Sequence, residues 1–469
     1  MTQHARPFES PFTLAHALNA ARVVLGVDTL PKDIATEVRR MTAGYLGRLR
    51  RLQQIEATGG RYRSRDALHR VQSSLAAKTI AFLLAYPSSR ASLTWAQVKS
   101  QSERVNPLRP SGERVISWEE AKRKNGARTI CSFGPVSRAA QQMVSHIIFV
   151  VAGPSPYEFA QSGRGRDAAA RITLHSIKHK GVRWFGLADV KDCFPSISRE
   201  MVKQVLPFLP SSIIDGTIFI HNDTDIKATC LNGDKANNKS VNAIRKSLPQ
   251  GSLVSLLVAS KVLQPHLDAL NAPLVIIHVD NVMIGAKTEE QIQANLTALT
   301  SLIEKASEGS LQLISEVRKF GDPEMDFLGY RFRRGWMRAG GFGRAYPANR
   351  SFRQLHYRLA RMLLLIPDTL WTKTIEQECA RWIRSFPAWT GRFRSEYFAI
   401  LNCELDMLPM LYRVRFATTE AKCVWASFSE MTEFVSDTAN VRADQMPRLF
   451  TEGGSSKLLK GASICPVIA

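Results

Sequence analysis

The sequence predicts an α+β protein in which a small antiparallel sheet lies between two helical regions. Apolar side chains recur at helical spacing in the first hundred or so residues, short β-branched runs follow, and helical spacing returns after the glycine-rich stretch 338–343. These changes in pattern divide the chain into a basic helical N-terminal extension, a mixed core, a helical region and a C-terminal tail of unknown role: 1–110, 111–335, 336–420 and 421–469.

The N-terminal extension combines one apolar helix face with a dense group of arginines. Between residues 39 and 70 the chain has nine arginines and two acids, and Gly59-Gly60 interrupts the helix. A solvated surface accounts for some of these arginines, but so few counter-charges favour contact with phosphates. The apolar face consists of Ile34, Val38, Met41, Tyr45, Leu49 and Leu52.

The charge of the whole chain indicates a polyanionic partner. Lys and Arg number 63 against 41 Asp and Glu, a net charge of +22, which favours nucleic acid over an anionic membrane. The longest apolar runs, such as 147–152, are far shorter than a membrane span, and the N-terminus lacks the apolar core of a signal peptide. Seven scattered cysteines contain no CxxC pair. We therefore expect a reduced, cytoplasmic protein.

The core region alternates predicted strands and helices. A polar, turn-rich segment, 210–245, is expected to form a surface insertion. The predicted strands are Arg128–Phe133, Val182–Asp189, Leu274–Val279, Val282–Ala286 and Phe327–Phe332.

The helical region after residue 336 has one face that can pack and one that is basic. The apolar face contains Leu355, Leu359, Met362, Leu363 and Ile366, and the basic face contains Arg350, Arg353, Arg358 and Arg361. Such a helix suits a phosphate backbone, but exposed arginines are common on helices, so both interpretations remain open.

Two polar residues interrupt the apolar stretch IIHVDNVMI, residues 276–284. Two strand-like runs on either side of Asp280-Asn281 predict a tight hairpin with these residues as its turn. Asp and Asn favour turns, so turn formation alone could explain them. A second carboxylate, Asp189, ends the predicted strand that begins at Val182.

The two aspartates suit the transfer of phosphoryl groups between nucleotides. Two-metal sites hold divalent ions about 4 Å apart, and Mg²⁺ or Mn²⁺ prefers oxygen ligands. Asp189 and Asp280 could supply such ligands from adjacent strands of one antiparallel sheet. The loop Leu248-Pro-Gln-Gly-Ser252 precedes an apolar helix, and its Gln250-Gly251 could let the backbone approach a base pair closely.

These blocks, in this order, resemble the reverse transcriptases over about residues 115–335. DVKDCFPSI, from Asp189, resembles the strand with the first catalytic aspartate, and LPQGS resembles the loop that contacts the dNTP and template. IIHVDN resembles the Tyr-x-Asp-Asp hairpin, and FLGY (327–330) resembles the primer grip. KNGARTI (124–130) and FAQSGRGR (159–166) resemble two blocks of the fingers.

The resemblance implies a right-hand polymerase fold with fingers, an antiparallel-sheet palm and a helical thumb. It implies RNA-directed DNA synthesis, in which a nucleotidyltransferase adds dNTPs to a primer 3′-hydroxyl with Mg²⁺ or Mn²⁺ bound by Asp189 and Asp280. Synthesis of DNA without a template remains an open alternative. Asn281 would act beside them at longer range, by tuning the field or holding water. Residues implied to bind the nucleotide are Arg128, Asp192, Phe194, Gln250, Gly251 and Lys319.

Other residues are implied to contact nucleic acid. The primer grip would be Phe327, Leu328, Gly329 and Tyr330. The expected contacts elsewhere are Arg48, Arg50, Arg51, Arg164, Arg166, Arg353, Arg358 and Arg361. Two members of the nucleotide set have a structural alternative, since Phe194 could be a core aromatic and Gln250 a helix-capping amide.

The bacterial reverse transcriptases are the most similar subgroup, because no protease, RNase H or endonuclease-like block is visible. The N-terminal extension and the 210–245 insertion favour the defence-associated, abortive-infection type over the group II intron, retron and diversity-generating types. The expected partners are an RNA template, which could be a dedicated noncoding RNA, the DNA product, dNTPs, and a second copy or a partner protein.

Three positions depart from the family pattern. Leu253-Val-Ser-Leu256 replaces the usual prolines, His278 replaces the tyrosine and Asn281 replaces the second aspartate. The last change leaves open an alternative, a catalytically silent polymerase-like RNA-binding protein with a degenerate Asp-Asn metal site. RNA-templated RNA synthesis is a third interpretation, which the bulky Phe194 disfavours.

Overall fold

The structure is a computed structural model. No helix in the part of the chain that it describes is long and apolar enough to cross a membrane. The structure describes residues 7–59, 61–121, 127–160, 164–230, 234, 236–322, 325–334, 343–348, 350–351, 354–355, 358, 377–378, 381–382 and 384–389. Arg353, Arg361, the tail 421–469 and most of the expected thumb lie outside these residues.

The N-terminal extension is helical, as its periodicity predicted. The apolar face of the longest helix is buried, apart from the half-buried Ile34, and the helix ends shortly before Gly59, whose φ of +77° favours glycine. The predicted helix face and helix break are thus confirmed. The helices are α1 (Leu14–Leu25), α2 (Lys32–Ala57), α3 (Arg61–Ser73), α4 (Leu75–Ala85) and α5 (Trp95–Glu103).

A buried polar contact joins the extension to helix α6 (Pro135–Ala152). The Tyr45 hydroxyl lies 3.0 Å from His146 Nδ1, and Gln142 Nε2 lies 2.8 Å from the other ring nitrogen. Phe12 stacks on the imidazole at a centroid distance of 4.8 Å. Burial lowers the pKa of His146 to about 3, so the imidazole is neutral near pH 7.

We expect the free energy of unfolding to fall as the pH drops from 7 to 5. An unfolded histidine binds a proton near pH 6.5, whereas folded His146 binds one only near pH 3. The unfolded state therefore holds more protons in this window, which makes His146 responsible for a loss of about 2 kcal/mol. Urea unfolding of wild type and His146→Gln at both pH values measures this loss. The variant should lose less than wild type, and equal losses would contradict the assignment.

The fingers contain a small sheet with strand order β2-β1-β4. Strand β1 (Val115–Ala121) pairs antiparallel with β2 (Ala127–Ser132) and parallel with β4 (Ile226–Thr229). Because β4 lies within the segment 210–245, the expectation of a mere surface insertion was wrong. The segment extends the fingers sheet and buries the apolar side chains of Ile213, Ile214, Ile218 and Ile244. Its other elements are α10 (Ser211–Ile213), the π-helix η1 (Ile214–Ile218) and α11 (Asn238–Lys246).

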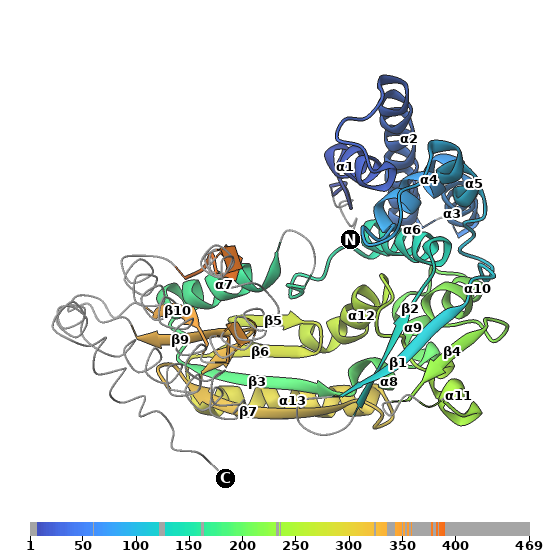
Figure 1. Ribbon diagram of the computed structural model, residues 1–469. Coiled ribbons are helices and arrows are strands. Elements are labelled where there is room, and N and C mark those ends of the chain that lie inside the picture. Colours follow the sequence, from blue (N-terminus) through green and yellow to red (C-terminus); the bar gives the residue numbers. More distant parts are fainter. Residues whose placement is uncertain are drawn as a thin grey trace, which may run out of the picture.

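The palm is an antiparallel sheet of four strands in the order β5-β6-β3-β7 (Figure 1). Helix α7 (Gly165–His179) packs on one face through Ala169 and Ala170, whereas α13 (Glu289–Ala306) packs on the other through Leu296. The helix α12 (Ser255–Asp268) follows the LPQGS loop. The strands are β3 (Trp184–Lys191), β5 (Leu274–His278), β6 (Asn281–Ala286) and β7 (Gln312–Lys319).

A second small sheet follows the palm, with strand order β10-β9-β8. Its apolar residues share one hydrophobic core with α7, with one face of the palm and with Trp382, Phe386 and Trp389. The strands are β8 (Asp326–Phe327), β9 (Tyr330–Arg334) and β10 (Gly343–Pro347). The remaining short helices are α8 (Cys193–Ser196) and α9 (Arg199–Val205).

Candidate active site

Strand pairing in the palm brings the end of β3, which carries Asp189, beside the β5–β6 turn, which carries Asp280. Asp189, near the end of β3, pairs in register with Asn281 at the start of β6. The Val190 amide donates a hydrogen bond to the Asp280 carbonyl over 3.0 Å. The side chain of Asp189 is exposed and that of Asp280 is half-buried. The two aspartates therefore come from neighbouring parts of one antiparallel sheet, as predicted, with Asp189 in a strand and Asp280 in the adjoining turn.

The turn of the hairpin lies one residue earlier than the sequence suggested. His278 pairs with Asn281, so the two turn residues are Val279 and Asp280. The expected Asp280-Asn281 turn was wrong because pairing with β3 draws Asn281 into the ladder. Val279 consequently has a φ of +66°, a conformation that costs a β-branched residue about 1–3 kcal/mol. Such strain is typical of functional sites, where the surrounding structure maintains it.

Asn281 contacts Asp280 directly. Its amide nitrogen donates a hydrogen bond to Asp280 Oδ1 over 2.7 Å. This contact is compatible with the expectation that Asn281 acts on a bound metal at longer range, which stays a prediction. The amide holds the neighbouring carboxylate in one orientation and adds no negative charge of its own.

Both aspartates lie close enough to the buried thiol of Cys193 to affect its pKa. Burial raises the pKa of Cys193, and the negative charges of Asp280 and Asp189 raise it further. The thiol therefore stays protonated and takes no part as a nucleophile. Both carboxylates therefore lie near Cys193, the first residue of α8.

Two carboxylates are the protein ligands that this site offers to a metal. No group of three or more His, Cys, Asp or Glu side chains suited to a metal occurs among the described residues. Carboxylate oxygens are hard ligands that suit Mg²⁺ or Mn²⁺, and a nucleotide's phosphates and water can complete the coordination. The residues present fit such ions, and Asp189 and Asp280 would hold them.

The strand that carries Asp189 continues into the short helix α8. Asp192 precedes this helix with a φ of +46°, and Phe194 is half-buried against the main hydrophobic core. The Phe194 carbonyl accepts a hydrogen bond from the Leu248 amide over 3.1 Å. This contact fixes the LPQGS loop beside the end of β3.

Gly251 brings the LPQGS loop against the fingers. The Cys131 amide donates to the Gln250 carbonyl over 2.7 Å, and Gly251 has a φ of +105°. A Cβ atom on Gly251 would lie 2.2 Å from the Cys131 carbonyl oxygen. This glycine therefore permits a close approach to β2, and the approach to a base pair that the loop motif suggested stays a prediction.

Arg128 lies on the outer face of the fingers sheet and is ion-paired. Its Nε and Nη2 lie 2.7 and 2.5 Å from the same carboxylate oxygen of Glu120, its partner across the β1–β2 pair. Trp118 is 39% exposed on β1 and pairs with Ile130, two residues from Arg128. Sequence reasoning missed Trp118. Its alternation with Ile116 and Glu120, both exposed, was the signal that could have identified an outward-facing aromatic.

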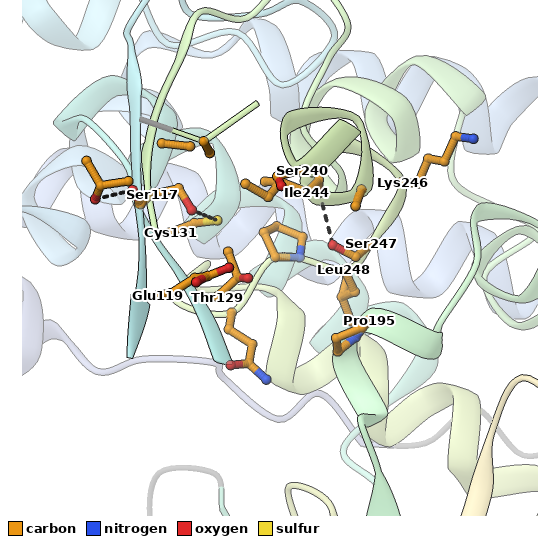
Figure 2. A pocket seen from close by; sticks show the side chains of 16 residues that line it. Ser117, Glu119, Thr129, Cys131, Pro195, Ser240, Ile244, Lys246, Ser247 and Leu248 are labelled. Atoms are coloured by element: carbon orange, nitrogen blue, oxygen red, sulfur yellow. Dashed lines mark hydrogen bonds between the residues drawn. The ribbon is translucent and has the colours of Figure 1, made fainter. Parts of the chain in front are cut away.

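The inner face of the fingers sheet encloses a cavity of about 450 Å³ (Figure 2). Side chains of β1 and β2 form one wall, α11 forms the roof, and Pro195 and Leu248 lie opposite. Gln250 lines the same cavity. The segment 210–245 therefore contributes α11 to the lining of this cavity, next to the LPQGS loop.

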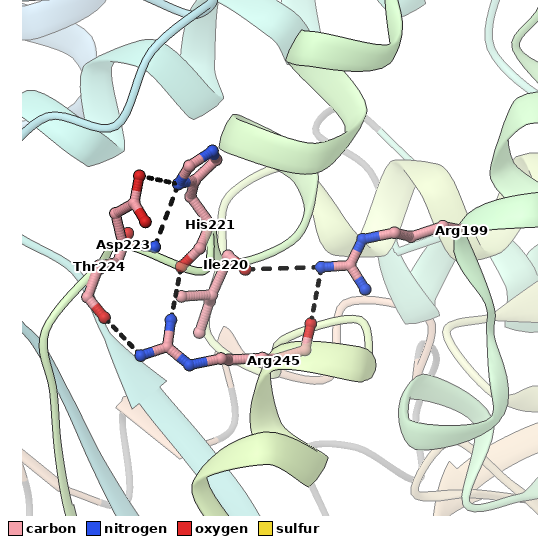
Figure 3. Close-up of polar contacts among 6 residues, drawn as sticks. All are labelled: Arg199, Ile220, His221, Asp223, Thr224 and Arg245. Carbon is pink, nitrogen blue, oxygen red and sulfur yellow. Dashed lines mark hydrogen bonds and ion pairs between the residues drawn. The ribbon is translucent and has the colours of Figure 1, made fainter.

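Two arginines connect α11 to α9 and to the turn at residues 220–224 (Figure 3). Arg199 of α9 donates to the Arg245 carbonyl over 2.9 Å and to the Ile220 carbonyl over 3.5 Å. Arg245 of α11 donates to the carbonyls of His221 and Thr224 over 2.6 and 2.7 Å. These bonds satisfy the backbone of a turn that forms no ladder of its own.

Arg164 and Arg166 form hydrogen bonds within the protein. Arg164 Nη1 donates to the carbonyls of Ser155, Pro156 and Glu158 over 3.0, 3.0 and 3.3 Å, which clamps the loop before it. Arg166 donates to the Ser385 carbonyl and lies 4.2 Å from the centre of the Phe386 ring. These contacts direct nitrogens of both guanidinium groups toward protein atoms, and the expected contact with nucleic acid stays a prediction.

The expected primer grip is a tight hairpin whose paired residues are buried, so that only its turn could contact a ligand. Phe327 pairs with Tyr330, and the turn residues Leu328 and Gly329 have φ values of +52° and +83°. Phe327 and Tyr330 are buried. The Tyr330 hydroxyl donates to Asp167 and accepts from the Ala388 amide over 3.3 Å. Both rings pack in the core, so a primer could meet this hairpin only at its turn, and its role as primer grip stays a prediction.

Lys319 lies away from the aspartates. It pairs with Trp184, and its Nζ is 5.2 Å from the centre of the Trp184 ring. Asp189 pairs instead with Ile314, five residues along the strand, or about 17 Å. Lys319 therefore lies at the opposite end of the paired strands from Asp189, because β7 runs antiparallel to β3, and this geometry gives the expected nucleotide contact no support.

The remaining expected nucleic-acid contacts lie on two helical parts of the chain. Arg48, Arg50 and Arg51 are all exposed on α2, although Arg50 lies 4.9 Å from the centre of the Phe8 ring. Arg358 is ion-paired with Glu378 at 3.0 Å.

Comparison with known proteins agrees with this geometry. Residues 121–332 match the family model for reverse transcriptase (RNA-dependent DNA polymerase), a range that contains Asp189, Asp280 and the LPQGS loop. No match was found among curated proteins. The chain therefore carries a reverse transcriptase domain, which implies a right-hand polymerase fold. It is an RNA-directed DNA polymerase, a nucleotidyltransferase whose substrates are dNTPs and a nucleic-acid template. Enzymes of this class generally use divalent ions, typically Mg²⁺.

Proposed function

We propose that the protein extends a primer 3′-hydroxyl with dNTPs by metal-assisted phosphoryl transfer at Asp189 and Asp280. The observation that carries this proposal is the register of β3 and β6, which brings both carboxylates to one edge of the palm. The hydrogen bond from Asn281 orients Asp280 and favours an intact site over a decayed one.

The reaction forms one bond and breaks one. The primer 3′-hydroxyl gives its proton to solvent and its oxygen attacks the α-phosphorus of the dNTP. The bond from that phosphorus to the bridging oxygen breaks, and pyrophosphate leaves with the electron pair. Divalent ions held by Asp189 and Asp280 would stabilise the charge that develops on these oxygens. Arg128 would exchange Glu120 for the triphosphate, and Gln250 would contact the incoming nucleotide.

An incorporation assay tests the proposal. Purified protein with its co-purifying RNA is supplied with labelled dNTPs or rNTPs and with Mg²⁺ or Mn²⁺. We expect DNA products that disappear after RNase treatment of the template. Absence of products with both metals would contradict the proposal, and products made only from rNTPs would assign RNA synthesis instead.

Sugar selection should depend on Phe194. We expect the half-buried ring of Phe194 to lie beneath the sugar and to exclude a 2′-hydroxyl, and the hydrogen bond of its backbone to Leu248 of the LPQGS loop supports this expectation. Phe194→Val should therefore raise rNTP incorporation relative to dNTP incorporation by about tenfold or more. Competition between the two nucleotide types measures the ratio, and thermal unfolding checks the fold. An unchanged ratio in a folded variant would make Phe194 a core aromatic only.

We further propose that this enzyme serves bacterial defence against phage in the cytoplasm. The support is the helical N-terminal extension together with the insertion that completes the fingers sheet. Phages should then form fewer plaques on bacteria that express the wild-type chain than on bacteria that express Asp189→Ala. Equal plaque numbers over a broad phage panel would contradict the role in defence and leave the polymerase activity unaffected.

A further inference from the structure

Tyr62 is unusually accessible for an aromatic residue. It lies in the first turn of α3 and is 89% exposed, more than any other large apolar side chain among the described residues. Single exposed apolar residues are ordinary on protein surfaces. Tyr62 differs because of the charges beside it.

The solvent face of α3 is basic. Ala67, Leu68 and Val71 turn into the core, whereas Arg63 and Arg65 are exposed and form no ion pair with any described residue. The acid of this helix, Asp66, is already paired with Arg70 at 2.9 Å. The arginines that flank Tyr62 are therefore available to an external anion.

Helix α2 adds further positive charge to the same helical hairpin. It packs beside α3, and residues 58–60 connect the two. Arg51 is exposed and lies six residues before the end of α2, a rise of about 9 Å. Figure 1 shows α1–α5 gathered around α6, apart from the palm strands. Arg51, Tyr62, Arg63 and Arg65, which we call the Tyr62 surface, are thus separate from the site of synthesis.

We propose that the Tyr62 surface binds an unpaired base of a folded RNA. Every base offers a flat face on which a tyrosine ring can stack, and neighbouring arginines can contact the flanking phosphates. A fully paired helix covers the faces of its bases, so the surface would select loops, bulges and ends. The choice of RNA over DNA rests on the proposed RNA-templated function.

Binding of fluorescently labelled RNA to the full chain tests this inference. Two probes of equal nucleotide number are compared by anisotropy without dNTPs: a hairpin with an unpaired loop and a blunt, fully paired duplex. Tyr62→Ala should weaken hairpin binding about tenfold and leave duplex binding unchanged. Tyr62→Phe should bind the hairpin as wild type does, because the ring is retained.

The arginines should respond differently from the tyrosine. Arg63→Ala with Arg65→Ala should weaken binding of both probes and flatten the plot of log affinity against log salt. Tyr62→Ala should leave that slope unchanged, because stacking releases no counterions. The combined replacement of Arg48, Arg50 and Arg51 measures the contribution of α2 in the same plot.

Two results would overturn the inference: hairpin affinity that Tyr62→Ala leaves unchanged, or an equal loss for hairpin and duplex. Thermal unfolding confirms that each variant is folded. DNA synthesis on a preannealed primer–template separates this inference from the proposed function. Tyr62→Ala should retain synthesis, whereas Asp189→Ala should lose synthesis and still bind the hairpin. If the wild-type chain makes no DNA but Tyr62→Ala still weakens hairpin binding, the RNA-binding inference is supported and the proposed function is contradicted.

Discussion

Asp280→Asn and Asp189→Ala should each reduce DNA synthesis by roughly a thousandfold or more. The site offers a metal these two carboxylates, and no larger cluster of metal-binding side chains occurs among the described residues. Removing either one takes away one of the two carboxylate charges that would hold divalent ions at this end of the palm strands. The uncharged amide in Asp280→Asn occupies the same volume, so the loss would reflect charge and not packing.

Primer extension with labelled dNTPs in Mg²⁺ and in Mn²⁺ measures this effect. Asp33→Asn is the matched control, because it makes the same change at an exposed position in the first turn of α2. The control should extend primers as wild type does. Synthesis retained in Asp280→Asn would show that this residue is not a metal ligand.

Substitutions of Asn281 distinguish an adapted site from a silenced one. Asn281→Ala removes the hydrogen bond to Asp280 and should lower synthesis only partly. Asn281→Asp should keep activity and lower the Mg²⁺ requirement, since a unit charge at ~4 Å contributes roughly 4 kcal/mol before hydration offsets much of it. Wild type should prefer Mn²⁺, which accepts looser geometry. If wild type is inert with both metals while Asn281→Asp is active, the site is silenced and the RNA-binding interpretation takes over.

Gly251→Ala should destabilise the fold by about 3 kcal/mol and raise the KM for dNTPs. The added Cβ would meet the Cys131 carbonyl oxygen at 2.2 Å, and the φ of +105° is unfavourable for alanine. The loop can relieve this contact only by moving away from β2, which also displaces Gln250 from the position that its carbonyl hydrogen bond maintains.

Urea unfolding and steady-state kinetics measure both effects. Gly47→Ala is the control, because Gly47 lies within α2 and a Cβ there meets no atom within 4 Å. Alanine is the better helix former, so this control should be slightly more stable than wild type. Equal unfolding midpoints for Gly251→Ala and wild type would show that the loop tolerates the side chain.

Local patterns in the sequence were sufficient to predict several parts of this protein. The spacing from Val38 to Leu52 predicted the buried face of α2, and Gly59 predicted its end, because helix periodicity and glycine conformations are properties of neighbouring residues. The order of DVKDCFPSI, LPQGS and IIHVDN indicated the reverse transcriptase domain, because each block is a short run of neighbouring residues that can be recognised without knowing the fold.

Only the tertiary structure decided how these blocks meet. The Val279–Asp280 turn depends on the pairing of β6 with β3, and the distance of Lys319 from Asp189 depends on the direction of β7. Arg164 resembles a nucleic-acid contact in sequence but clamps the carbonyls of 155–158. Such outcomes follow from contacts between residues far apart in the chain or from backbone groups that need a partner, neither of which a residue's type reveals. The sequence determined which chemical groups this enzyme has, and the strand register determined which of them can act together.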